Sequence, residues 1–197
     1  MALAPGIRPR QAPLPVGQAV RATARCVVVT AKLLVQRRIH LPRRHVGWRL
    51  HFADGTQARV YRETVIDRRR SGQPAVLLVT FRLRGVHGAP AHALFRLESI
   101  LNTVLFAGFP GMVSKLWLAH DGTGAYRGLY QWDEPALAQD YARALWRVLA
   151  LVSHRDSISY HVLAGLTRDE LLRDPGLLGG PPGAQWWRLI EVEQAAT

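Results

Sequence analysis

The chain has 197 residues, of which 48% are hydrophobic and 20% charged, and its formal net charge is +12. This apolar content excludes a wholly disordered chain, and no apolar run reaches the roughly 18 residues that a membrane-spanning helix needs. A single cysteine, Cys26, excludes an internal disulfide framework and fits a reducing compartment, so the predicted location is cytoplasmic.

The positive charge is concentrated near the N-terminus. Residues 1–53 carry ten basic side chains and no acidic one, whereas the remaining 144 residues carry 16 basic and 14 acidic side chains. Residues 1–47 contain no aromatic side chain on which a base could stack. The sequence therefore does not favour nucleic acid as a partner. It leaves open packing beside the rest of the protein or contact with an anionic membrane surface.

The first 74 residues predict an arm, a helix and a hairpin. Residues 1–17 are rich in proline and glycine, which predicts a disordered arm. Residues 18–74 form a basic extension that begins with an amphipathic helix from Gln18 to Arg38. A strand at Cys26–Thr30 is the alternative, because three valines follow one another there. A hairpin is predicted over residues 47–66, with Asp54-Gly55 in its turn, and a solvated linker follows at 67–74.

Residues 75–165 alternate between strand and helix patterns. Strands are predicted at 75–83, 112–120, 125–132 and 157–163. One helix begins at Pro90, and another follows Asp133, which is the predicted N-cap. The order βαββαβ predicts an α+β fold with a ferredoxin-like domain, in which both helices cover one face of an antiparallel sheet. Residues 166–197 form a C-terminal tail whose Trp186-Trp187 pair packs on this domain or on a partner.

The predicted strands have one apolar face and one mixed face, because side chains alternate along a strand. The apolar face belongs under the helices. The mixed face also holds valine and leucine, which predicts pairing with a second copy of the chain, as a homodimer, or the wall of a cavity. The alternative is a solvated face partly covered by the N-terminal region. The polar and aromatic residues of the mixed face are Thr80, Arg82, Lys115, Trp117, Arg127, Gln131, Ser159 and His161.

The segment 108–141 resembles the dimeric α/β-barrel superfamily, and above all its small mono-oxygenase-like proteins. The pattern G-x-x-x-K-x-W followed by G-x-Y-x-W carries this resemblance, at Gly111, Lys115, Trp117, Gly128, Tyr130 and Trp132. The resemblance covers about residues 75–165. It implies a dimeric α/β barrel to which the N-terminal helix and hairpin are added. It also implies cofactor-independent mono-oxygenase chemistry, so no cofactor is expected.

His161 and Lys115 are the candidate catalytic residues. A histidine on a strand suits a general base near neutral pH, and a hydrogen-bonded structural histidine is the alternative. Lys115 lies beside Trp117 on one face, where a cation and an indole can bind a planar anion or stabilise an enolate. The alternative for Lys115 is an ion pair with a carboxylate of a second copy. The other residues of the mixed face, Thr80, Arg82, Trp117, Arg127, Gln131 and Ser159, are expected to bind the ligand.

The sequence therefore predicts a small hydrophobic or aromatic ligand in a cavity lined by the sheet. No metal is expected, because the paired histidines fall in loops without acidic residues at ligand spacing. The alternative function is a non-catalytic binding or assembly module. Its basic N-terminal segment would dock on a partner or, at the periphery, on a membrane.

Overall fold

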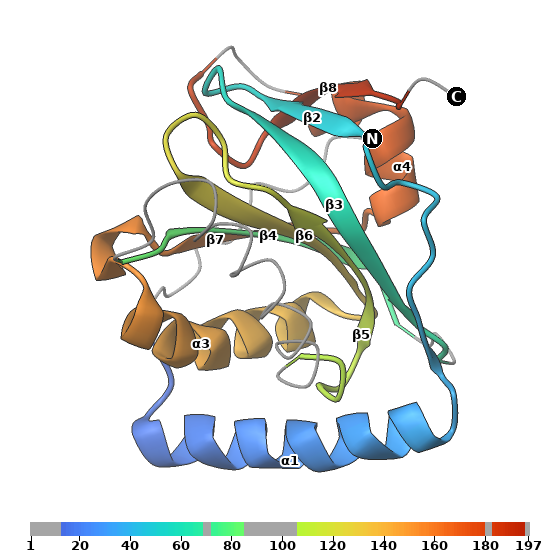
Figure 1. Cartoon of the computed structure of the whole chain (residues 1–197), viewed down its shortest axis with the longest axis vertical. Coiled ribbons are helices and arrows are strands. Elements are labelled where there is room, and N and C mark those ends of the chain that lie inside the picture. The colour runs from blue at the N-terminus through green and yellow to red at the C-terminus, as the bar shows by residue number, and fades with distance from the viewer. Residues whose placement is uncertain (1–12, 69–71, 85–105, 180–182, 196–197) are drawn as a thin grey trace.

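One long antiparallel sheet organises the protein. The computed structural model describes residues 13–68, 72–84, 106–179 and 183–195. The sheet is curled into a half-barrel, with strand order β7-β4-β6-β5-β3-β2-β8, and β1 pairs separately with β3 (Figure 1). The strands are β1 (Ile39–His40), β2 (Arg49–Phe52), β3 (Gln57–Ile66), β4 (Ala75–Arg82), β5 (Met112–Leu118), β6 (Ala125–Trp132), β7 (Ser159–Ala164) and β8 (Leu189–Glu193). The α-helices are α1 (Val16–Val35), α3 (Pro135–Val152) and α4 (Arg168–Arg173).

The predicted N-terminal helix is confirmed as α1, and the strand alternative at Cys26–Thr30 is wrong. The buried residues of α1 are Ala19, Cys26, Thr30 and Leu33, which recur at helical spacing along one side. Burial of this side outweighs the preference of consecutive valines for a strand. Of the arm predicted at 1–17, residues 1–12 lie outside the described part of the chain.

The predicted hairpin is confirmed, and it belongs to the main sheet. Strands β2 and β3 pair antiparallel around the turn that contains Asp54. Strand β3 then pairs with β5 along its other edge. The basic extension (residues 18–74) and the ferredoxin-like segment (residues 75–165) therefore form one continuous sheet.

Strands β7-β4-β6-β5 lie in the order expected for a ferredoxin-like domain, all antiparallel. The helix predicted after Pro90 falls within residues 85–105, outside the described residues. Helix α3 follows β6 as predicted, but the predicted cap is wrong by one residue. Glu134 is the N-cap of α3, and the Asp133 carboxylate instead accepts a hydrogen bond from the backbone of Gly72.

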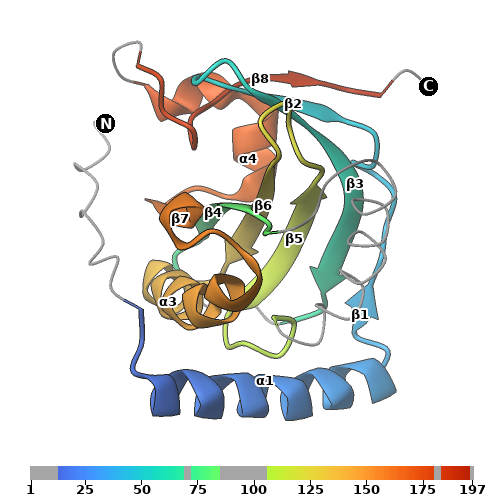
Figure 2. The same ribbon diagram turned by 60° about the vertical axis from the view of Figure 1, so that its left-hand side comes forward.

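The chain's own segments cover both faces of the sheet. Helix α3 packs on one face and α1 lies beneath α3, whereas α4, β2 and β8 lie on the opposite side (Figures 1 and 2). A second apolar core fills this opposite side, and Trp186 and Trp187 pack against it. The hairpin and the C-terminal tail thus cover part of the mixed face that was expected to meet a second copy, while the Arg82 side chain on it is exposed. Homodimerisation stays a prediction.

Candidate functional site

The eight predicted site residues lie on two different faces of the sheet. Lys115 pairs in register with Tyr130, which in turn pairs with Leu77, and these residues face α3. Trp117 follows two residues later on the same side. The other six point to the face covered by α4 and β8: Thr80, Arg82, Arg127, Gln131, Ser159 and His161.

A register shift in β5 separates Lys115 and Trp117 from the other six residues. Met112 pairs with Trp132 and Ser114 pairs with Gln131, so Val113 is an extra residue in β5. Such a bulge reverses the alternation of faces for all the residues that follow it. Strict alternation from Met112 therefore assigns Lys115 to the wrong face. This part of the prediction is corrected.

His161 and Lys115 lie on opposite faces of the sheet. Its ring stacks on the Trp187 indole, with centroids 3.8 Å apart and planes 9° apart. Burial lowers the pKa of His161 below its usual value, which favours the neutral ring. The stack corresponds to a structural histidine, the alternative considered from the sequence.

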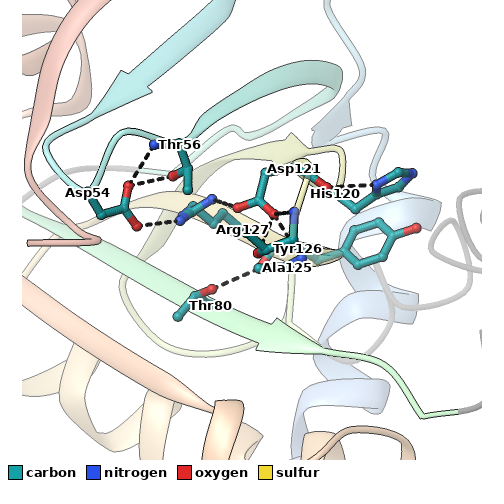
Figure 3. Close-up of polar contacts among 9 residues, drawn as sticks. Asp54, Thr56, Thr80, His120, Asp121, Ala125, Tyr126 and Arg127 are labelled. Carbon is teal, nitrogen blue, oxygen red and sulfur yellow. Dashed lines mark hydrogen bonds and ion pairs between the residues drawn. The ribbon is translucent and has the colours of Figure 1, made fainter. Parts of the chain in front are cut away.

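Arg127 joins two turns of the sheet (Figure 3). Its guanidinium bonds the carboxylate of Asp121 and also donates to Asp54 Oδ2 at 3.0 Å. Burial raises the pKa of Asp121, but hydrogen bonds from Thr123 and Arg127 outweigh it, so the pKa is below its usual value. Two carboxylates therefore bind the guanidinium, and the predicted role of Arg127 in ligand binding stays a prediction.

The remaining four predicted ligand-binding residues belong to strands of the sheet. Thr80 donates a hydrogen bond to the Tyr126 carbonyl, and Arg82 has an exposed side chain whose backbone N–H donates to Ser157. Gln131 is buried and Ser159 is half-buried on the same face. None of these four is among the described residues that line the apolar cavity between the sheet and α3.

That cavity lies between the sheet and α3. It has a volume of about 430 Å³, within the usual range for small-molecule sites. Its described walls carry seven aromatic rings, and aliphatic side chains of α3 close the other side. The aromatic residues are Tyr61, Phe81, Phe106, Trp117, Tyr126, Tyr130 and Tyr141. The sequence predicted Trp117 as a ligand-binding residue and indicated no such role for the other six, although the recurrence of rings at alternate strand positions was a signal.

Lys115 is the only lysine in the cavity wall and extends into a cage of aromatic rings. Its Nζ lies 3.1 Å from the ring centroid of Trp117, 4.6 Å from that of Tyr130 and 4.7 Å from that of Phe106. The residue is 7% exposed. Within the described part of the chain, its amine has neither a hydrogen bond nor an ion pair. The side chain comes from β5, a central strand of the sheet.

Burial disfavours the charged form of this amine. An unpaired ammonium loses several kcal/mol of hydration on burial, and contact with an aromatic face offsets about 2 kcal/mol of that loss. The Arg62 guanidinium, centred 3.9 Å from the Trp117 ring, adds repulsion. Burial first, and the charge of Arg62 second, hold the pKa of Lys115 well below its usual value. The cavity therefore shifts this amine toward its uncharged form, which has a lone pair.

Two tyrosine hydroxyls stand at the α3 side of the cavity. Tyr130 and Tyr141 hydrogen bond to each other, and burial raises the pKa of both phenols. Both remain protonated at neutral pH, so neither supplies an anion. Across the described ranges, no group of three or more His, Cys, Asp or Glu side chains is placed to hold a metal ion.

A second buried polar cluster ties α4 to the hairpin. Glu63 of β3 accepts from Arg168 at 2.8 Å and contacts the His45 ring nitrogen at 2.9 Å. Although burial raises the pKa of Glu63, its bonds to His45 and Arg168 hold it below the usual value. This cluster is satisfied internally, so it is structural.

Two solved structures are similar to this chain. One is an uncharacterized ferredoxin fold protein related to antibiotic biosynthesis monooxygenases from Listeria monocytogenes 4b F2365, with 14% identity over 56% of this chain and 64% of that one, at a TM-score of 0.39. The other is an anthrone oxidase-like protein, with 14% identity over 57% of this chain and 59% of that one, at a TM-score of 0.33. Both likenesses concern the fold alone.

No protein-family model matches the sequence, and neither does any curated protein. The chain spans about three-fifths of the length of each similar structure. What it binds must therefore follow from its own residues. Within the described ranges, no helix combines the length and hydrophobicity required to cross a bilayer.

Proposed function

We propose that the chain binds a planar aromatic small molecule in the cavity between the sheet and α3. One observation carries this proposal: seven aromatic residues line the cavity, and the Lys115 amine extends into it without a hydrogen bond or ion pair from any described residue. A satisfied core would contain no such polar atom, because a buried donor without a partner is costly. A ligand with one polar group would supply the missing partner.

The neutral amine of Lys115 selects the polar group of the ligand. Unlike an ammonium, it accepts a hydrogen bond from a phenol and donates one to a carbonyl. The rings around it stack on flat ligands, offset or edge-on. The favoured class is therefore a phenol or an aromatic carbonyl compound, without a fixed charge that the apolar walls would have to desolvate.

Cofactor-independent mono-oxygenase chemistry is the reaction that we propose for such a ligand. In this reaction a ring CH₂ becomes C=O, one atom of O₂ enters the product and the other leaves as water. The first step removes a proton from the substrate. Lys115 is the base that the cavity offers, and the resulting ammonium would lie beside the substrate anion. His161 lies behind the sheet and has no part in this step.

Ligand binding is tested by thermal unfolding with 2-naphthol as the probe. At one hundred times the Kd, a ligand stabilises the folded state by about 2.7 kcal/mol, which raises Tm by about 5–10 °C for a chain of this size. Lys115→Met keeps the volume and removes the nitrogen, so 2-naphthol should bind about tenfold more weakly while naphthalene binds unchanged. Lys32→Met, on the exposed surface of α1, is the matched control. No shift with wild type, or equal affinity in Lys115→Met, would overturn the proposal.

We also propose that α1 docks on an anionic membrane surface. Its outward side carries exposed valines, including Val28 at 71% and Val35 at 85% exposure. Arg21, Arg25 and Lys32 are also exposed and lie along one border of this valine side. Helix α1 runs along the outside of the molecule in both views (Figures 1 and 2). An apolar stripe bordered by cations is typical of a helix that lies in the membrane interface.

Vesicle sedimentation tests this second proposal. The protein should bind vesicles of phosphatidylcholine with 30 mol% phosphatidylserine and not vesicles of phosphatidylcholine alone. Val28→Asp should abolish binding, and the same substitution at exposed Leu151 of α3 is the control. Equal binding to both vesicle types, or none, would contradict it. A dimer that Val28→Asp dissociates would instead assign the face to a second copy.

A further inference from the structure

The amine of Lys115 faces the cavity without a hydrogen bond or ion pair within the described residues. Three aromatic rings surround it, and its side chain is almost wholly buried. We propose that Lys115 captures aromatic aldehydes or ketones in the cavity as a Schiff base. This inference rests on the proposed ligand-binding function and names a more specific substrate class for the same site.

Schiff-base formation requires an unprotonated amine next to a carbonyl carbon. The nitrogen lone pair forms the C–N bond while the C=O π electrons move to oxygen. A proton passes from nitrogen to that oxygen, and the carbinolamine then loses water to give C=N. The step consumes one carbonyl and releases one water, and it needs neither oxidant nor reductant.

The surroundings of Lys115 favour each part of this step. Burial and the nearby Arg62 charge disfavour the ammonium, so the lone pair is available near neutral pH. Among the described residues, Tyr130 of β6 faces the amine with a phenol that stays neutral, and Arg84 and Arg127 also line the cavity. Apolar walls exclude the water that would hydrolyse the imine. A flat aromatic carbonyl compound can stack on the same rings while its carbonyl carbon meets Nζ.

The chain contains a second lysine whose reactivity can be compared directly with that of Lys115. Lys32 is the other lysine, and it is exposed on α1. At pH 7 about one ordinary lysine side chain in 2,500 is unprotonated. Reaction at Lys115 should therefore exceed reaction at Lys32 even though Lys32 is more accessible.

The experiment traps the imine with cyanoborohydride. The full-length protein is incubated with 2-naphthaldehyde at pH 7, and the modified lysine is located by peptide mass spectrometry. We expect at least about tenfold more adduct on Lys115 than on Lys32. Adduct at Lys32 should rise steeply toward pH 9, whereas adduct at Lys115 should change little. Lys115→Met should lose the adduct, whereas Lys32→Met should keep the adduct at Lys115. 2-Naphthalenemethanol, which cannot form an imine, should bind the wild-type protein without forming an adduct.

The two proposals fail in different ways. If 2-naphthalenemethanol binds and the aldehyde labels Lys32 as much as Lys115, the Schiff base is wrong and ligand binding stands. The same conclusion follows if an adduct at Lys115 has the steep pH dependence of Lys32. If neither aromatic compound binds or reacts, both proposals fall.

Discussion

Removing the Lys115 amine should change how stability depends on pH. In the unfolded chain this lysine has an ordinary pKa near 10.4 and carries a proton at pH 7. In the folded chain burial lowers its pKa well below that value, so the folded state holds one proton fewer. Stability then rises with pH, by about 1.4 kcal/mol per unit, from the folded pKa up to about pH 10.4. Below the folded pKa, both states are protonated and the full penalty applies.

Lys115→Met removes this dependence, because methionine fills a similar volume and does not titrate. The variant should be more stable than wild type at pH 7. Its advantage should shrink by about 2.7 kcal/mol between pH 7 and pH 9, if the folded pKa lies below 7. Urea denaturation at pH 7, 8 and 9 measures the difference in unfolding free energy between the variant and wild type. The contributions of the other titrating groups cancel in this difference. The unfolding free energy of Lys32→Met should depend on pH in the same way as that of wild type. If the unfolding free energy of Lys115→Met also follows wild type across this pH range, Lys115 is an ordinary charged lysine and the reasoning fails.

Three further predictions concern the structure around the site. Arg127→Met should lower the free energy of unfolding by about 3–5 kcal/mol, since it leaves the buried Asp121 carboxylate without its partner. Glu63→Gln should cost about 3 kcal/mol at pH 7. Because the folded pKa of Glu63 is lowered, that cost should fade as pH falls below about 4. Gly128→Ala should weaken 2-naphthol binding, since its Cβ would lie 2.6 Å from the Tyr130 ring and push it into the cavity.

Each of these predictions has a control within the chain. Arg49→Met breaks an ion pair whose side chains are about half exposed, so it should cost less than about 1 kcal/mol. A loss that small for Arg127→Met would contradict its role as a clamp. A cost of Glu63→Gln that persists at pH 3 would show that its charge is not the cause. Gly122→Ala has open space around its Cβ and should leave naphthol affinity unchanged, and Gly128→Ala must differ from it.

The sequence alone predicted the identity of most elements, because local patterns determine them. Helical spacing of buried residues outweighed the valine run in α1, and the Asp-Gly turn located the hairpin. The four strands between residues 75 and 165 were found from residue type and turn residues. The concentration of ten basic residues before Asp54 was also readable directly, and three of them, Arg21, Arg25 and Lys32, lie on the exposed side of α1.

Only the tertiary structure decided which side chains meet. One extra residue, Val113, turns Lys115 and Trp117 toward α3, and no local pattern specifies a bulge that depends on pairing with β6. The ring that stacks on His161 belongs to Trp187, and the two carboxylates that bind Arg127 belong to two separate turns. Only chain folding brings these residues together. The cavity and its uncharged amine follow from that packing, since burial is a property of the whole fold and not of residue 115.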